Sequence, residues 1–182
     1  MNRTLPDPGS APILTHFTRA SGRASALDNL LAILAAGVIR AASRMVSGRR
    51  GVVCLFDAPL AELGALLARR NRRRYEPFGV AIDRRYAFQA GARPVIYLPP
   101  GEAHALLPAS ELWRTVSFDL RRTPAVDWTF EREWRMAGDL AVPPEAVAIV
   151  ENWHDVDAVF DRFDGQPPCA GVLPLRGLSP SL

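Results

Sequence analysis

The chain has 182 residues, of which 48% are hydrophobic and 23% charged, a composition typical of one globular domain with its own core. No apolar run approaches the roughly 20 residues that a membrane helix needs, and the polar first dozen residues lack a signal-peptide core, so we expect a cytoplasmic protein that does not contact the membrane. All 22 basic residues are arginine and the formal charge is +3. A GC-rich genome accounts for the missing lysine, and the arginines permit a nucleic-acid partner without requiring one.

The predicted elements begin with a strand at 13–18 and a loop at 21–25. Apolar residues then recur at helical spacing until Gly37, which predicts a helix that ends there. A brief extended piece at 38–39 and an exposed loop over 41–50 lead to a buried strand at 52–56. Pro59 begins a second predicted helix, which ends in the arginines Arg69, Arg70, Arg72, Arg73 and Arg74.

The second half is predicted to hold mainly strands. We expect strands at 79–82 and 94–98, a helical turn or a loop at 101–107, and a half-buried strand at 113–120. An extended segment at 133–137, a strand at 146–150, a helix at 154–163 and a strand at 169–175 follow. Because strands outnumber helices and do not alternate regularly with them, the expected class is α+β. Residues 1–12 are expected to form a flexible arm, 13–176 one domain and 177–182 a tail.

Several common chemistries lack their motifs. The three histidines, His16, His104 and His154, have neither HxxxH nor HExxH spacing, and Cys54 and Cys169 form no CxxC, so we expect no metal site. The glycines form no phosphate-binding loop, and no GxSxG is present. Two cysteines are too few for a disulfide framework, and Cys54 is expected to be a buried thiol.

His16 and Thr18 lie two residues apart in the first predicted strand, so their side chains are expected to share one face. Both could then project into one cleft. On this pair alone, a histidine hydrogen-bonded by its neighbours at a strand end is the better explanation.

The segment 131–135 has the same period, with Glu131, Glu133 and Arg135 on one face and Arg132 and Trp134 on the other. A carboxylate presented to a cleft can stabilise an oxocarbenium-like sugar. The alternative is a solvated edge strand whose charges pair with neighbours. The pattern alone favours that alternative.

The cluster Arg69–Arg74 also permits two interpretations. Cations suit the C-terminal end of a helix dipole, so a solvated helix end is favoured. The functional alternative is a patch that contacts nucleic-acid phosphates.

Taken in order, these segments resemble two bacterial families. The opening of the DarT-type DNA ADP-ribosyltransferases is similar to His16-x-Thr18, Asn29-Leu30, Ile33-Leu34 and Gly37. The runs at 53–60, 78–82 and 94–97 and the segment Phe130-x-x-Glu133-Trp134-Arg135 resemble an antitoxin family of an abortive phage-resistance system. This second resemblance spans most of residues 13–151.

The resemblance implies a split two-sheet ADP-ribosyltransferase-like fold with peripheral helices, which clasps NAD as co-substrate. His16 would then bind a ribose, Thr18 would support the adenosine side, and Phe56 would line the nicotinamide pocket. Glu133 would bind the nicotinamide ribose and steady the oxocarbenium as nicotinamide leaves. Arg44 would hold the diphosphate, with Arg49 or Arg50 as the next choices.

The same resemblance implies an ADP-ribosyltransferase that modifies DNA or RNA in a toxin–antitoxin or phage-defence setting, beside a cognate toxin or antitoxin. An aromatic clamp of H-Y-E type is missing, which leaves open a non-catalytic antitoxin or sensor module that binds a partner protein or RNA. A third alternative is transfer of an RNA 2′-phosphate to NAD, which would need several basic residues around one phosphate.

Overall fold

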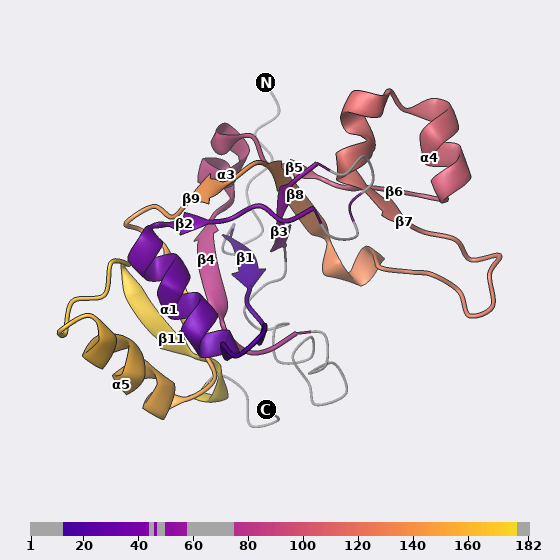
Figure 1. The fold of residues 1–182 in the computed structure, drawn as a ribbon. Helices are drawn as coiled ribbons and strands as arrows, with labels where there is room; N and C mark the ends of the chain where they lie inside the picture. Colours follow the sequence, from indigo (N-terminus) through magenta and orange to yellow (C-terminus); the bar gives the residue numbers. More distant parts are fainter. Residues whose placement is uncertain (1–12, 44–45, 47–49, 58–74, 178–182) are drawn as a thin grey trace, which may run out of the picture.

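A computed structural model describes residues 13–43, 46, 50–57 and 75–177 (Figure 1). The predicted arm, the helix expected from Pro59, Arg44, Arg49 and the cluster Arg69–Arg74 lie outside the described residues, as do residues 178–182 of the predicted tail. Within the described ranges the chain mixes helices with one large sheet and two small ones, which confirms the α+β class.

The large sheet has seven strands in the order β11-β10-β4-β1-β3-β8-β5. Among its described strands β10 and β11 are parallel, and all other neighbours are antiparallel. The strands are β1 (Ile13–Phe17), β3 (Val52–Phe56), β4 (Gly79–Asp83), β5 (Arg93–Pro94), β8 (Glu133–Ala137), β10 (Val147–Val150) and β11 (Gly171–Pro174). The small sheets pair β2 (Val38–Ile39) with β9 (Leu140–Ala141), and β6 (Ile96–Leu98) with β7 (Thr115–Ser117).

Helix α1 (Ala26–Ala36) confirms the first predicted helix and owes its ends to its sequence. The Ser25 side chain accepts a hydrogen bond from the Asp28 backbone N–H, and the Asp28 carboxylate accepts one from the Ser25 backbone N–H. This reciprocal pair satisfies two N–H groups that a helix start otherwise leaves free. Gly37 ends the helix with φ 62°, a left-handed conformation that glycine adopts without steric cost.

The core is divided by the large sheet. The larger cluster lies on the face covered by α1 and α5 (Trp153–Arg162), where alternate strand residues meet the helices. It includes Leu14, Leu55, Val80, Val150, Leu30, Leu34, Val156 and Val159. The smaller cluster lies on the opposite face and consists of Phe56, Tyr75, Ala81, Ile149 and Leu175, with Phe17 packed against it.

A lobe extends from the β5 end of the sheet (Figure 1). It comprises residues 96–117, namely β6, α4 (Pro100–Leu106), the 3-10 helix η3 (Ala109–Arg114) and β7. We call it the α4 lobe. Residues 101–107 were expected to form either a helical turn or a loop, and α4 shows that the segment is helical up to Leu106.

The α4 lobe corrects two strand predictions. The single strand expected at 94–98 is divided, because Arg93 and Pro94 pair with β8 whereas residues 96–98 pair with β7. Pro94 lacks an N–H, so it suits the edge strand of the large sheet. The strand expected at 113–120 is also shorter, because Trp113 and Arg114 complete η3.

Helix α3 (Arg84–Ala90) was not predicted. Asp83 begins it by accepting a hydrogen bond from the Tyr86 N–H, and Gly91 ends it with φ 112°. Only Ala87 among its seven residues is buried, so the helical hydrophobic period is nearly absent. A further 3-10 turn, η4 (Thr129–Glu131), precedes β8, and η5 (Leu175–Gly177) follows β11.

The pairing of β1 with β3 is the narrowest connection in the middle of the sheet. Strand β1 has five register pairs with β4, and β3 has five with β8, whereas β1 and β3 share the single pair Thr15 with Phe56. The seven strands of the large sheet thus form one continuous sheet with a seam between β1 and β3 at its centre. No helix among the described residues is long and apolar enough to span a bilayer.

Candidate functional site

The register of three adjacent strands places Thr15, Phe56 and Glu133 side by side. Thr15 on β1 is opposite Phe56 on β3, and Phe56 is opposite Glu133 on β8. Directly opposed residues of an antiparallel pair project from the same face. That face is the one with the smaller core cluster, because Thr15 is also opposite Ala81. Two of the predicted site residues, Phe56 and Glu133, are therefore brought together.

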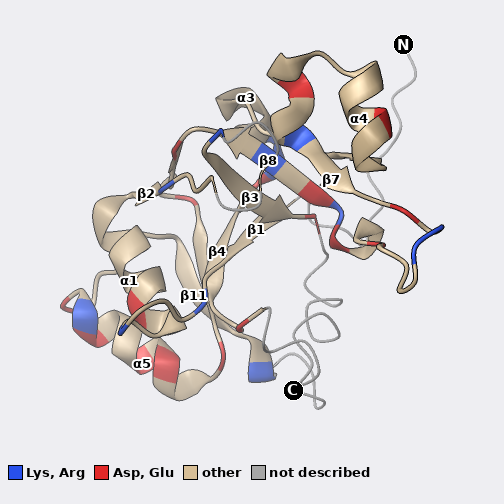
Figure 2. Ribbon diagram, turned by 45° about the vertical axis from the view of Figure 1, so that its right-hand side comes forward, with Lys and Arg blue, Asp and Glu red and all other residues tan. Residues whose placement is uncertain are grey.

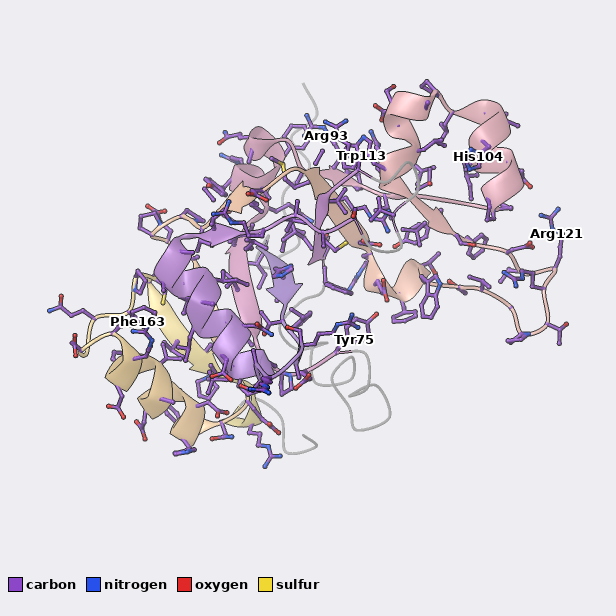
Figure 3. The ribbon with its side chains drawn as sticks, viewed as in Figure 1. Tyr75, Arg93, His104, Trp113, Arg121 and Phe163 are labelled. Carbon is purple, nitrogen blue, oxygen red and sulfur yellow. The ribbon has the colours of Figure 1, made fainter. Side chains whose placement is uncertain are left out.

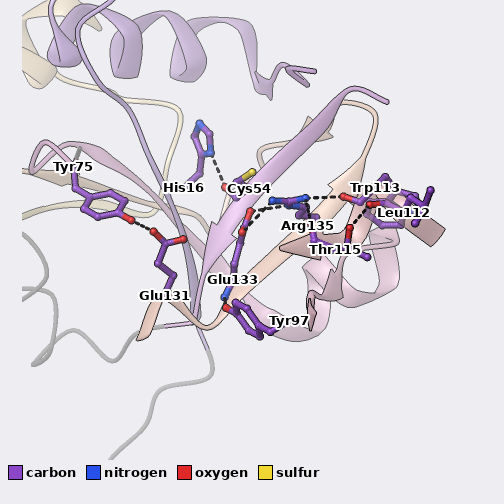
Figure 4. Close-up of polar contacts among 10 residues, drawn as sticks. All are labelled: His16, Cys54, Tyr75, Tyr97, Leu112, Trp113, Thr115, Glu131, Glu133 and Arg135. Atoms are coloured by element: carbon purple, nitrogen blue, oxygen red, sulfur yellow. Dashed lines mark hydrogen bonds and ion pairs between the residues drawn. The ribbon is translucent and has the colours of Figure 1, made fainter. Parts of the chain in front are cut away.

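Three aromatic rings meet on this face. The Phe56 ring lies 5.4 Å from that of Phe17 and 5.2 Å from that of Tyr75 between centroids, and both contacts are edge-on. The Tyr75 hydroxyl donates a hydrogen bond to the Glu131 carboxylate (Figure 4). Tyr75 was missed from the sequence because it lies alone between the arginine cluster and β4, outside any periodic segment.

Glu133 and Arg135 form a buried ion pair (Figure 4). Arg135 Nε donates to Glu133 Oε1 at 2.8 Å, and Nη2 donates to Oε2 at 3.3 Å. Glu133 is 6% exposed and Arg135 7%. The two charged residues are separated by Trp134 along β8, where an acidic and a basic segment of the ribbon lie close together (Figure 2).

The burial of these residues corrects the interpretation of 131–135 as a solvated edge strand. Strand β8 lies between β3 and β5, so it is not an edge. That interpretation also expected the charged residues to form ion pairs, and Glu133 does pair with Arg135. The alternation starts only at Glu133, because Glu131 belongs to η4 and Arg132 has a left-handed φ of 43°. Glu131 is nevertheless buried, and its carboxylate reaches the aromatic rings through Tyr75.

His16 does not share the face of Glu133. It is opposite Val80, which belongs to the larger cluster under the helices. Its Nδ1 lies 2.9 Å from the carbonyl oxygen of Cys54, across the seam between β1 and β3. Burial lowers the pKa of the imidazole, so the neutral ring donates from Nδ1 to that carbonyl and leaves Nε2 as an acceptor.

Thr18 directly follows β1, and its hydroxyl is engaged by backbone carbonyl groups. Thr18 Oγ1 donates to the Ala26 carbonyl oxygen at 2.8 Å and lies 3.3 Å from that of Phe78. It is buried, and it fixes the start of α1 to the end of β1. The structure therefore gives both residues of the His16–Thr18 pair hydrogen bonds to backbone carbonyls.

Among the arginines considered for a diphosphate, only Arg50 is described. Its guanidinium lies 5.7 Å from the centroid of the Trp113 ring. Arg50 precedes β3, so it lies at the end of that strand away from Phe56. The structure does not bring it to the row of Thr15, Phe56 and Glu133.

The α4 lobe contains a cavity of about 40 Å³, lined by Leu98, Pro100, Ala103, His104, Thr115 and Ser117. Ligand pockets are usually roughly 300–1,000 Å³, so this one is too small for a dinucleotide. His104 lies on the lobe and Tyr75 beside the large sheet, in different parts of the molecule (Figure 3). Within the described ranges, no three histidine, cysteine or acidic side chains gather as a metal site would need.

Thr15 offers a test of the site's packing. Its side chain is 0% exposed, and Oγ1 has no hydrogen-bond partner among the described residues. A buried hydroxyl without a partner costs about 1–3 kcal/mol. We therefore expect Thr15→Val to raise the free energy of unfolding by about 1 kcal/mol in urea denaturation. Thr115→Val is the matched control, because Thr115 Oγ1 donates to the Leu112 carbonyl oxygen and its removal should destabilise. Equal destabilisation by both changes would contradict an unpartnered Thr15.

Cys54 is half-buried rather than fully buried, and its thiol lies beside Glu133 and Arg135. Burial, together with the negative charge of Glu133, raises the pKa of this thiol to about 12 from 9.0. Because the thiolate is the reactive form, alkylation of Cys54 at pH 8 should be roughly 1,000-fold slower in the folded protein than in the unfolded one. Mass spectrometry of iodoacetamide-treated samples measures this ratio. Equal rates in the two states would show that the thiol is neither buried nor next to a carboxylate.

No protein-family model, curated protein or solved structure matches the chain.

Proposed function

We propose that this chain is a cytoplasmic, NAD-dependent ADP-ribosyltransferase of the split two-sheet type that modifies nucleic acid in a toxin–antitoxin or phage-defence setting. The observation that carries the proposal is the pair of buried carboxylates, Glu131 and Glu133, around the Phe17–Phe56–Tyr75 rings on one sheet face. Buried carboxylates are costly and cluster at functional sites. The seam between β1 and β3 supports the split-sheet assignment.

The chemistry uses what this face offers. A planar pyridinium ring is favoured beside aromatic side chains, and in this proposal the buried rings of Phe56 and Tyr75 would fill that role. When the bond from C1′ of the ribose to the pyridinium nitrogen breaks, its electron pair stays on nitrogen and nicotinamide leaves as a neutral ring. The positive charge left on the sugar is stabilised by the Glu133 carboxylate. A nucleic-acid oxygen or nitrogen then bonds to C1′ and loses its proton to water.

The structural placement changes the roles proposed for individual residues. In this proposal Tyr75 would supply the aromatic ring that the sequence comparison lacked, and His16 holds β1 to β3 through the Cys54 carbonyl. Glu133 and Phe56 keep their proposed roles. Arg44 at the diphosphate and Arg69–Arg74 at the nucleic acid remain predictions, since they lie outside the described residues.

The test measures nicotinamide released from NAD in the presence of single-stranded DNA or RNA. We expect release by the wild type, and its loss in Glu131→Gln and in Phe56→Leu, which alter the carboxylates and the rings separately. Glu145→Gln is the control, because Glu145 is an exposed carboxylate that belongs to neither η4 nor β8. A wild type that releases no nicotinamide with either acceptor would refute the proposed activity.

A second candidate, a non-catalytic antitoxin or sensor module that binds a partner protein or RNA, is favoured by one observation. Both Glu133 oxygens accept hydrogen bonds from Arg135, so the charge of the carboxylate is already balanced. Thermal denaturation with NAD separates the candidates, because binding to the folded state raises its stability. A transferase should show a raised melting temperature and turnover. The non-catalytic module should release no nicotinamide from NAD in any sample.

A further inference from the structure

Arg135 has an unusually complete set of partners. Besides its two hydrogen bonds to Glu133, its Nη1 donates to the carbonyl oxygen of Trp113 at 2.8 Å and to that of Thr115 at 2.9 Å. A guanidinium has five N–H donors in a fixed planar fork, and four hydrogen bonds are formed here. Lysine could not reproduce this arrangement, because its donors radiate from a single nitrogen.

The carbonyl groups that Arg135 holds belong to the α4 lobe, at the junction of η3 with β7. Glu133 contacts the same region through its backbone. Its N–H donates to the hydroxyl of Tyr97 in the lobe at 3.0 Å, and its carbonyl accepts at 3.0 Å from the N–H of Val95, the residue directly before the lobe. The orientation of the Glu133 carboxylate and the attachment of the lobe therefore depend on one connected set of hydrogen bonds, of which the four made by Arg135 are buried.

We propose that Arg135 is a positioning residue for Glu133, and that it couples the carboxylate to the position of the α4 lobe. This inference rests on the proposed function. The bidentate contact fixes the plane of the carboxylate, while each oxygen keeps a second lone pair for a ribose hydroxyl or a developing positive charge. Arg135 itself does not contact the reacting atoms.

The coupling has a kinetic signature. A carboxylate that is misplaced by about 1 Å loses about 100-fold in rate, because stabilisation of the transition state depends on its position. The aromatic rings on β1 and β3 do not depend on Arg135, so NAD binding should change little. Loss of Arg135 should thus reduce kcat much more than it changes KM.

The experiment compares wild type, Arg135→Lys, Arg135→Gln and Arg40→Met. Arg40 is the control because it forms an exposed ion pair with Asp139, outside the lobe and the carboxylate face. Nicotinamide release gives kcat and KM for NAD, and hydrogen exchange without NAD reports on residues 96–117. Arg135→Lys keeps the charge and loses the fork, and Arg135→Gln keeps one N–H₂ donor group. Because Arg135→Gln leaves the Glu133 carboxylate buried without its counter-charge, urea denaturation gives the folded fraction of each variant, and kcat is expressed per folded molecule.

We expect kcat to fall about 100-fold in Arg135→Gln and less in Arg135→Lys, with KM within about threefold of wild type. Hydrogen exchange across residues 96–117 should be faster than in wild type, and more so in Arg135→Gln than in Arg135→Lys. Arg40→Met should match wild type in every measurement. An active wild type whose kcat or lobe exchange is unchanged in Arg135→Gln would overturn the positioning role alone. A wild type without nicotinamide release would overturn the proposed function and, with it, this role.

Discussion

Glu133→Gln should lower the free energy of unfolding by about 3–5 kcal/mol, because it leaves the Arg135 guanidinium buried without its counter-charge. Removing both charges in Glu133→Gln/Arg135→Met should recover about half of that loss. Recovery is incomplete since the carbonyl oxygens of Trp113 and Thr115 lose their donor as well. Urea denaturation of wild type, Glu133→Gln, Arg135→Met and the double variant gives the coupling energy directly.

Asp139→Asn provides the comparison for this cycle. Asp139 also pairs with an arginine, at 2.6 Å from Arg40 Nη1, but both side chains are exposed. Water already solvates such a pair, so we expect no measurable change in stability. Additive effects at Glu133 and Arg135 would mean that the buried pair is not energetically coupled. The cycle also matters for enzymology, because loss of turnover in Glu133→Gln has to be corrected for its unfolded fraction.

Gly79→Ala is expected to lower the free energy of unfolding by about 3 kcal/mol or more. A Cβ at this position would collide with the carbonyl oxygen of His16 and come within 3.2 Å of Phe17 Cα. Both obstacles are backbone atoms of the neighbouring central strand β1, which cannot move aside without disturbing the register of five residue pairs. Thermal denaturation followed by circular dichroism measures the effect.

Gly101→Ala is the matched control for that substitution. Gly101 lies in the first turn of α4, and nothing lies within 4 Å of the added Cβ. Alanine is the better helix former by about 1 kcal/mol, so this variant should be as stable as wild type or slightly more stable. An unchanged melting temperature in Gly79→Ala would show that β1 and β4 are not packed as closely as described.

The fold was predictable where a segment carries its own signal. Strand β3 and helix α1 combine a strong apolar pattern with clear ends, and both were located correctly. The division of 94–98 between two sheets was not predictable, because the run of apolar residues is the same whichever partner strand each residue takes. Helix α3 has only one buried residue, so its capping residues Asp83 and Gly91 were its main available signal.

The site was predictable only in part. The alternation around Glu133 correctly indicated that Glu133 and Arg135 share a face, but local sequence cannot tell a buried central strand from an exposed edge. The resemblance implied that His16 and Glu133 bind one NAD, yet the register of β1 with β4 places His16 on the other face of the sheet. Register is a property of strand pairing across long stretches of sequence. Tyr75 reaches Glu131 through the same tertiary arrangement.

The strand order has a consequence for how the chain reaches this structure. Neighbouring strands in the centre of the sheet are remote in sequence, as Thr15 opposite Ala81 and Val53 opposite Met136 illustrate. Such pairings need large loops to close before any contact forms, so the expected folding rate is low for a chain of this size. Strand β4 pairs with both β1 and β10 through several residue pairs, whereas β1 and β3 share a single residue pair at the seam. We therefore expect the β1–β4–β10 unit to become ordered first, and β3 with β8 to join it late.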